Sequence, residues 1–315
     1  MKPTKDTGIV TVAAIRRPKR EGMTEYLFNE RQQIFTLRAT MKSAEESSRR
    51  LEEASRTKEP VRVVLDTRQA LIHRIDTPSP RELKEFQKGR TLLDKPDRTA
   101  AIDVSSIDPT TFNLVDYHLK VPTFRLCTHI VPNYSTAKTI FCYCAKQSCN
   151  LPGPYDISPC IPFQYVRDGC YARAHKMRWI ITTKFGYCCE KVFSCANQNY
   201  DRLAVEADKW GGCCVTWWYH VAPLVRVRVR IGTLSVVLAL VIDPGMFDKP
   251  VLLSTWLAAQ ENTACDPNAH VSMYSIQPGS AYWPANYAGT AFATDPSYIL
   301  TDSTLTAYSS LTTCP

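Results

Sequence analysis

Residues 168–178, DGCYARAHKMR, place a cysteine directly after a glycine and at the start of a helical pattern. Apolar residues continue from this cysteine at the spacing i, i+4, i+7 and i+11, which gives the predicted helix one buried face. That face carries Cys170, Ala174, Met177 and Ile181. We expect the helix to reach Lys184, with Gly186 as its stop. Unpaired N–H groups and the dipole at a helix start favour a thiolate, so Cys170 is a candidate nucleophile.

Two further segments offer partners for such a nucleophile. Residues 217–222, WWYHVA, place His220 on a predicted strand. Residues 241–244, VIDP, place Asp243 at the end of another strand. A cysteine nucleophile needs an imidazole as base, and the imidazole needs a carboxylate that fixes its tautomer. The three segments together predict a Cys-His-Asp site.

The register of one hairpin brings the second and third residues together. A turn at Gly232-Thr233 joins the two strands, and a two-residue hairpin would pair Ile231 with Leu234. In that register His220 and Asp243 lie on the same face as diagonal neighbours, within side-chain reach. A slip of one residue would separate them.

Each site residue also has an ordinary structural interpretation. Cys170 taken alone is equally well a buried or disulfide-bonded cysteine, His220 a hydrogen-bonded strand histidine, and Asp243 a turn former before proline. His175 is a rival base that is closer in sequence, but it lies five residues beyond Cys170 and a helix rotates it away from the sulfur. The combination of three residues, each placed where its role requires, favours the site.

The composition bounds the class of protein. The chain has 315 residues, a formal charge of +8 and 44% apolar residues, which is ordinary for one large domain or two smaller ones. Basic residues are spread along the chain rather than gathered in one patch, so we expect no nucleic-acid binding. The apolar run over residues 234–242 is too short to span a membrane and predicts a buried strand.

All thirteen cysteines lie from Cys127 onward, which marks a boundary near residue 125. Their density predicts a disulfide-bonded domain in an oxidising compartment, with a reduced cytosolic protein as the alternative. The odd number leaves at least one thiol free, and Cys170 is the best candidate. No secretory signal is visible, because the apolar stretch Gly8–Ile15 is short and runs into two arginines. We nevertheless expect the protein to be secreted.

The N-terminal part reads as a small module with a thin core. Residues 1–25 are expected to be a basic, poorly ordered arm, and residues 34–58 a helix. Residues 61–65 and 70–75 predict a hairpin, and residues 81–88 a short helix. This pattern corresponds to an αββα arrangement.

The C-terminal part has clearer periodicity. A helix is expected over residues 135–147 with Ser135 as N-cap. Residues 225–231 alternate valine with arginine, which predicts a strand with one basic, solvated face, and residues 234–242 predict a central apolar strand. A short helix over residues 254–260 and a loop-rich tail complete the prediction.

A series of ordered motifs then extends from Gln147 to Trp256. They are Gln147-Ser148-Cys149, Ser158-Pro159-Cys160-Ile161, residues 168–178, Gly186-Tyr187, Cys189-Glu190-Lys191, Cys213-Cys214-Val215, Tyr219-His220-Val221-Ala222, Ile242-Asp243-Pro244, Phe247, Pro250-Val251 and Trp256. In these motifs the chain resembles the bacterial protein-glutaminases, the secreted protein-glutamine deamidases. Ile130-Val131-Pro132 also resembles the start of the mature enzyme.

The resemblance implies a papain- or transglutaminase-like cysteine hydrolase core of α+β class, with the cysteine-bearing helix packed on an antiparallel sheet. It implies that Cys170 is the nucleophile, His220 the base and Asp243 the orienting acid. It further implies that residues 1–125 are an inhibitory pro-region, with a small α+β fold, and residues 126–315 the catalytic domain. Residues 90–125 read as an extended segment, either a linker or a strap, and residues 99–103 are the part expected to enter the active-site cleft.

These expectations define a function. The protein is expected to convert protein-bound glutamine to glutamate with release of ammonia through a thioester, with no metal or organic cofactor. Its expected partners are proteins or peptides with exposed glutamine and its own pro-region, and it is expected to act as a monomer. The alternatives are transglutaminase-like acyl transfer, papain-like peptide cleavage, and a non-enzymatic toxin or adhesin on the same scaffold.

Overall fold

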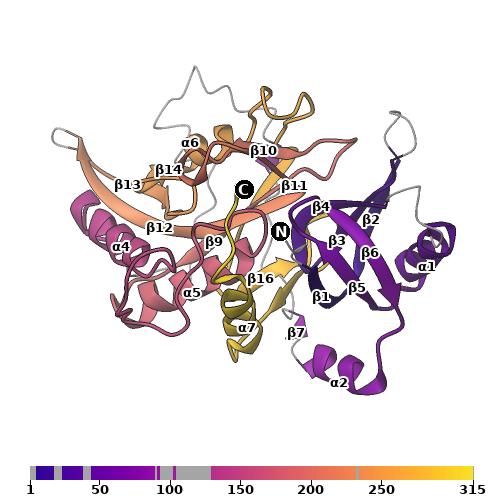
Figure 1. The fold of residues 1–315 in the computed structure, drawn as a ribbon. Helices are drawn as coiled ribbons and strands as arrows, with labels where there is room; N and C mark the ends of the chain where they lie inside the picture. Colours follow the sequence, from indigo (N-terminus) through magenta and orange to yellow (C-terminus); the bar gives the residue numbers. More distant parts are fainter. Residues whose placement is uncertain are drawn as a thin grey trace.

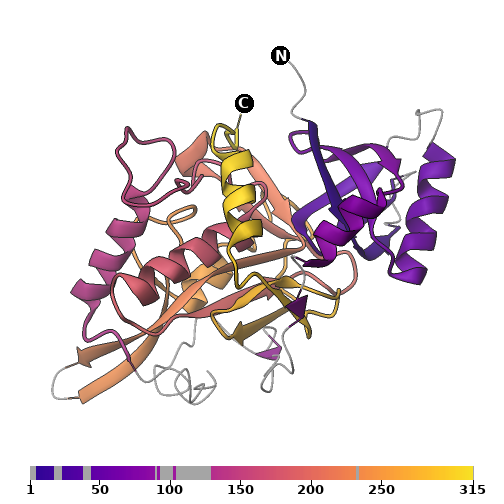
Figure 2. The same ribbon diagram turned by 90° about the horizontal axis from the view of Figure 1, so that it is seen from below.

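The computed structural model describes residues 5–17, 23–37, 44–88, 91–92, 102–103, 129–231 and 234–314. The fold is α+β, as the sequence predicts, with a small N-terminal module beside a larger C-terminal part (Figures 1 and 2). The predicted boundary near residue 125 and most of the predicted extended segment lie outside the described residues. Within the described ranges, no helix has the length and apolar character that a membrane crossing requires.

The N-terminal module is a twisted, mostly antiparallel sheet flanked by two helices. Its strands are β1 (Lys5–Val10), β2 (Val12–Arg16), β3 (Glu25–Phe28), β4 (Arg31–Leu37), β5 (Val61–Asp66) and β6 (Leu71–Asp76), and its helices are α1 (Ala44–Thr57) and α2 (Pro80–Lys88). The β5–β6 hairpin and helix α2 confirm the prediction. A parallel pairing joins β4 to β6.

Two N-terminal predictions are wrong. Within the expected disordered arm, residues 5–10 and 12–16 form strands β1 and β2, and the first residues of the expected helix belong to β4. Val10 and Val12 are buried with Phe35 and Leu37 in one apolar cluster. Burial of these side chains against partners distant in sequence outweighs the basic composition that suggested disorder. Helix α1 begins only at Ala44, just before a run of charged residues, and its Leu51 is buried in the same cluster.

The C-terminal part is built on a six-stranded sheet in the order β14-β13-β12-β9-β15-β8. These strands are β8 (Ile102–Asp103), β9 (Glu190–Cys195), β12 (Tyr219–Ile231), β13 (Leu234–Val241), β14 (Val251–Leu252) and β15 (Met273–Gln277). Its helices are α4 (Tyr134–Lys146), α5 (Cys170–Thr183), α6 (Leu253–Ala258) and α7 (Ile299–Tyr308), with a 3-10 turn η2 (Asp208–Trp210).

Helix α5 packs along β12, with α4 beside it (Figure 2). Residues at alternate positions of β12 enter different clusters: Val225 packs in the cluster of α5, and Leu224 in that of α6. The two helices therefore cover opposite faces of this strand. The Cys-bearing helix on an antiparallel sheet is the arrangement that the sequence predicts.

The β12–β13 hairpin has the predicted register. Ile231 pairs with Leu234, and the ladder continues to Leu224 and Val241. The turn residues themselves lie outside the described part of the chain. Beyond Val241 the chain leaves the ladder, and the N–H of Ile242 donates to Pro223 O at 3.0 Å. This exit directs the next residue, Asp243, toward the start of β12.

The C-terminal tail is structured, which corrects the prediction of a loop-rich end. In addition to β15 and α7 it forms β16 (Ala281–Pro284) and β17 (Phe292–Thr294), which make a three-stranded sheet with β7 (Thr91–Leu92). Tyr282 and Phe292 are buried in the main cluster. A second correction concerns α4, whose N-cap is Asn133 rather than Ser135; the Asn133 side chain accepts from Thr136 N.

One sheet crosses from the N-terminal module into the C-terminal part. Strand β4 pairs with β11 (Cys214–Trp217), which in turn pairs with β10 (Leu203–Glu206). The crossing consists of a single residue pair, Gln33 with Trp217, and a neighbouring bond from Trp218 N to Gln32 O. The N-terminal module thus docks by extending a sheet edge of the C-terminal part.

The C-terminal part is disulfide-bonded, as predicted. Disulfide bonds join Cys149 to Cys160, Cys213 to Cys314 and Cys214 to Cys265, and Cys188 is also oxidised. Among the described cysteines Cys142, Cys144, Cys170, Cys189 and Cys195 carry free thiols. Cys170 is free, as expected, but it shares this state with four others.

The Cys213–Cys314 and Cys149–Cys160 disulfides close loops of different length and should therefore contribute differently to the free energy of unfolding. Cys213–Cys314 spans 101 residues and Cys149–Cys160 spans 11. Because the loss of unfolded-state entropy grows with loop length, removal of the first by a Cys213→Ser, Cys314→Ser double change should cost about 2–5 kcal/mol. The Cys149→Ser, Cys160→Ser variant should cost less. Urea unfolding of both variants tests this order, and the reverse order would contradict it.

Candidate active site

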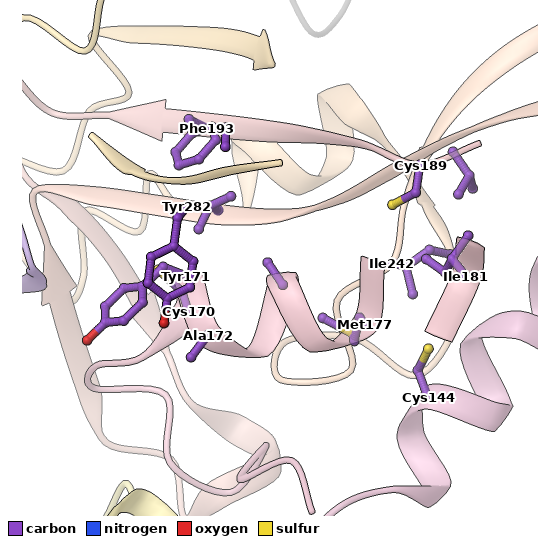
Figure 3. Close-up of a cluster of buried hydrophobic side chains, with 14 of the residues drawn as sticks. Cys144, Cys170, Tyr171, Ala172, Met177, Ile181, Cys189, Phe193, Ile242 and Tyr282 are labelled. Atoms are coloured by element: carbon purple, nitrogen blue, oxygen red, sulfur yellow. The ribbon is translucent and has the colours of Figure 1, made fainter. Parts of the chain in front are cut away.

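Cys170 is the first residue of α5, at the place that the sequence predicts. The preceding Gly169 has φ +80°, and a Cβ at that position would lie 2.9 Å from the ring of Tyr308. Only glycine accommodates both the left-handed backbone and the close ring. This turn directs the backbone N–H of Cys170, which has no partner within the helix, out of the helix start. Figure 3 shows Cys170 there beside Tyr171, with Met177 and Ile181 farther along α5.

His220 and Asp243 are joined by a hydrogen bond. His220 Nε2 lies 2.8 Å from Asp243 Oδ2, and the indole N–H of Trp256 donates to the same oxygen at 2.9 Å. The His220 ring is stacked between Trp217 and Trp256, with centroid distances of 4.6 and 5.3 Å. These contacts fix both the position of the imidazole and its tautomer, because Nε2 must carry the proton that Asp243 accepts.

Cys170 lies against the same strand. The backbone N–H of Val221, the residue after His220, faces the Cys170 thiol. Among the described residues, no hydrogen bond joins the thiol to the imidazole, and His220 Nδ1 is buried without a partner. The structure therefore unites His220 with Asp243 and places Cys170 next to them, with the unprotonated imidazole nitrogen still unpaired.

Burial decides the charge state of the thiol in this structure. Cys170 is 1% exposed, and burial raises the pKa of its thiol although Arg173 acts in the opposite direction. The sequence predicted a thiolate at the helix start, so the neutral thiol is a correction for the full-length chain. Desolvation by surrounding protein outweighs the helix terminus.

Asp243 remains a carboxylate despite its burial. Burial alone would raise its pKa, but the neighbouring imidazole and the hydrogen bonds from His220 and Trp256 lower the pKa below its ordinary value of 3.8. A buried carboxylate with two donors is the partner that an imidazolium needs.

His175 belongs to a different network. Its Nε2 lies 3.1 Å from Asp295 O, and its Nδ1 lies 2.7 Å from the Nζ of buried Lys191. Burial and the neighbouring Lys191 and Arg178 lower the pKa of His175 to about 2. Both ring nitrogens are engaged and the ring resists protonation, which is consistent with its rejection as the base.

The N-terminal module inserts a glutamine side chain beside Cys170. The Cys170 N–H donates to Gln32 Oε1 at 2.8 Å, and Gln32 Nε2 donates to Val166 O at 3.0 Å. The Gln32 N–H donates to Asp168 Oδ1 at 3.1 Å, and Trp218 N–H donates to Gln32 O at 2.9 Å. Gln32 is 0% exposed. A carboxamide is thus held with its oxygen on the helix-start N–H of the candidate nucleophile.

The segment expected to enter the cleft, residues 99–103, is described only in part, because residues 99–101 lie outside the described residues. Of residues 99–103, the described pair Ile102–Asp103 forms strand β8 and pairs with Met273 and Tyr274 of β15. The residues that approach Cys170 are instead in β4, where neighbouring Arg31 lies 3.5 Å from Asp168 Oδ2. Strand β4 pairs through its backbone with β11 near Cys170. The short strand β8 pairs with β15 instead, at the edge of a different sheet.

Sequence reasoning missed the roles of Trp217, Trp256 and Gln32. Trp256 appeared only as the end of the motif series and Trp217 only as a neighbour of His220. An indole beside a buried carboxylate is a common donor, so that signal was present in principle. For Gln32 no local signal exists, because its partner is 138 residues away.

Comparison with known proteins is consistent with this arrangement. A family described as Glutaminase matches residues 137–260. A crystal structure of protein-glutaminase shares 36% identity over 59% of this chain and 92% of its own, with a TM-score of 0.51. The chain belongs to the protein-glutaminase family. The NMR structure of protein-glutaminase from Chryseobacterium proteolyticum shares 37% identity over 59% of this chain and 91% of its own, with a TM-score of 0.50.

The family likeness also extends through the N-terminal module. A crystal structure of pro-protein-glutaminase shares 28% identity over 99% of this chain and 95% of its own, with a TM-score of 0.69. The chain therefore contains a glutaminase domain preceded by an N-terminal pro-region, as the resemblance implied. Among curated proteins, no sequence matches.

Trp256→Phe should weaken the site through Asp243. The change removes a hydrogen bond to a charged group, worth about 1.5–3 kcal/mol, so activity should fall roughly ten- to a hundredfold. Because the folded-state pKa of Asp243 is depressed, its contribution to stability is present above pH 3.8 and lost as pH falls through the lower folded value. Without the Trp256 bond the folded-state pKa of Asp243 rises toward 3.8, so the variant should be less stable near neutral pH and should lose less stability than wild type as pH falls.

Urea unfolding across roughly pH 5 to pH 2 measures this shift. Trp283→Phe is the matched control, since the Trp283 indole N–H is buried without a partner among the described residues. Equal acid sensitivity in the two variants would contradict the role of Trp256.

The free thiols should differ in reactivity with iodoacetamide. Cys142 is exposed and Cys170 is buried with a raised pKa, so the full-length chain should be alkylated at Cys142 first. Removal of the pro-region should accelerate labelling of Cys170 and leave that of Cys142 unchanged. Peptide mapping by mass spectrometry gives both rates, and equal Cys170 labelling before and after removal would refute burial by the pro-region.

Proposed function

We propose that this protein deamidates glutamine side chains of other proteins, with Cys170 as nucleophile, His220 as general acid and base, and Asp243 as the residue that orients and stabilises the imidazolium. The observation that carries the proposal is a carboxamide seated at Cys170: Gln32 has its oxygen on the Cys170 N–H and its nitrogen on Val166 O. A site that accepts both ends of a glutamine amide suits hydrolysis of that group.

The steps follow from these positions. Cys170 gives its proton to His220 Nδ1, the nitrogen that does not contact Asp243, and its sulfur attacks the amide carbon. The Cys170 N–H stabilises the negative oxygen of the tetrahedral intermediate at the distance of 2.8 Å seen for Gln32. His220 returns the proton to the leaving nitrogen, and ammonia departs.

Hydrolysis completes the cycle. His220 Nδ1 accepts a proton from water, and the hydroxide attacks the thioester carbon. The carbon–sulfur bond breaks, which leaves a glutamate side chain and regenerates Cys170. Asp243, held ionised by its two donors, stabilises the imidazolium in both halves of the cycle.

We further propose that residues 1–125 are an inhibitory pro-region and residues 126–315 the catalytic domain. Strand β4 supports this, because it extends the sheet edge at β11 and fills the position of a substrate amide with Gln32. The disulfide bonds of the C-terminal part support work in an oxidising, extracellular environment.

Ammonia release from a glutamine-containing protein tests the function. The full-length chain and a sample cleaved near residues 115–130 are assayed in parallel. We expect ammonia only, or mainly, after cleavage, and a full-length chain that is equally active would refute inhibition. Incorporation of an added primary amine would instead identify a transglutaminase, and substrate fragments would identify a peptidase.

Variants of the three site residues test the mechanism. Cys170→Ala should abolish ammonia release, and His220→Ala should be nearly inactive. Asp243→Asn should lose roughly two to four orders of magnitude in rate, because the amide favours the wrong imidazole tautomer. His175→Ala serves as the comparison, and a greater loss of activity there than in His220→Ala would overturn the assignment. Circular dichroism confirms that each variant is folded.

A further inference from the structure

We propose that Gln32 is itself a substrate: the active site deamidates this pro-region glutamine within the same chain and converts it to glutamate. The inference rests on the proposed function and assigns that function its first target. It also defines the bound form of a substrate as a glutamine on an extended strand that pairs with a sheet edge.

All four polar groups of Gln32 are engaged by the C-terminal part. Its backbone N–H and C=O bind Asp168 and Trp218, and its side-chain oxygen and nitrogen bind Cys170 and Val166. A side chain that only blocked the cleft sterically would need no matched hydrogen bonds. Here each of the four polar groups of Gln32 has a partner in the C-terminal part, so Gln32 is bound as a reactant would be.

The side-chain orientation suits reaction. The amide oxygen lies 2.8 Å from the Cys170 N–H, which is the distance expected of an oxyanion donor. The amide nitrogen shares Val166 O with the indole N–H of Trp217, and the His220 ring stacks on that indole. The leaving nitrogen therefore lies beside the indole on which the His220 ring stacks.

The neighbouring glutamine provides an internal contrast. Gln33 is also buried, but its Nε2 donates to Thr67 O within the pro-region at 2.9 Å. Side chains alternate along a strand, so Gln32 points to Cys170 and Gln33 away from it. An enzymatic reaction should distinguish these two adjacent residues, whereas spontaneous deamidation has no reason to select the one beside Cys170.

The reaction balances without an added reagent other than water. The Cys170 sulfur bonds to the Gln32 side-chain carbon, the carbon–nitrogen bond breaks, and ammonia leaves with the thiol proton. Water then cleaves the carbon–sulfur bond, which gives a glutamate side chain at position 32 and the free thiol. Because burial raises the pKa of the thiol and Gln32 is fully covered, both steps should be slow, and the thioester can persist until β4 admits water.

Peptide mapping of the intact full-length chain tests the proposal. The protein is incubated in water enriched in oxygen-18, and residues 32 and 33 are followed by mass spectrometry. We expect Gln32 to gain the mass of an NH2-to-OH exchange with one heavy oxygen, while Gln33 remains unchanged. Cys170→Ala should leave both intact. Asp243→Asn, a milder change, should slow the conversion if Cys170→Ala proves unstable.

Two other outcomes are informative. Loss of ammonia with a covalent link between the peptides carrying Gln32 and Cys170 would support the proposal as the trapped thioester. Unmodified Gln32, in a sample whose cleaved counterpart has fully deamidated an added protein over the same period, would overturn it and leave the proposed function standing. Equal conversion in wild type and Cys170→Ala would also overturn it. A cleaved chain that releases no ammonia from any protein would refute the function itself.

Discussion

The arrangement of the site depends on one buried carboxylate. Asp168 is 0% exposed, and it accepts from Gln32 N–H and from the Tyr308 hydroxyl, with Arg31 nearby. It thereby connects the pro-region, the C-terminal helix α7 and the start of α5. A buried charge is costly unless such partners are present, so these segments are bound to one another by the need to solvate it. Gly169 follows Asp168 directly, and its left-handed turn sets the direction of the Cys170 N–H.

The balance between desolvation and compensating contacts also sets the charge of two other buried groups, the Asp243 carboxyl and the Cys170 thiol. Asp243 has two donors and remains ionised, whereas the Cys170 thiol has little compensation for its burial and remains neutral. Asp243 has the neighbouring imidazole and two hydrogen bonds to offset its burial, whereas burial raises the pKa of a thiol whose ordinary value is already 9.0. The structure therefore keeps the histidine–carboxylate pair assembled while the Cys170 thiol remains uncharged. Exposure of the site to water removes the desolvation that raises the pKa of the Cys170 thiol.

The sequence predicted those parts of the fold whose signal is local. The apolar spacing after Cys170, the valine–arginine alternation of β12 and the apolar run of β13 each indicate an element, and hairpin register was enough to bring His220 to Asp243. The predicted solvated face of β12 is wrong at Arg226, which is buried against Glu190. Strands β1 and β2 and the C-terminal tail were missed because their apolar residues are buried with partners distant in sequence; Val10, for example, lies in one cluster with Phe35. The role of Gln32 was missed for the same reason, because nothing in the local sequence RQQIF distinguishes Gln32 from Gln33.

Because the sheet passes from β4 to β11, proteolytic cleavage between the two parts does not by itself separate them. Strand pairing, the four contacts of Gln32 and the ion pair of Arg31 with Asp168 do not depend on peptide continuity between the two parts. A severed chain is accordingly a non-covalent complex of two polypeptides, and its dissociation follows mass action. Cleavage changes an intramolecular contact into a concentration-dependent one, and dilution away from the site of synthesis then favours the free enzyme.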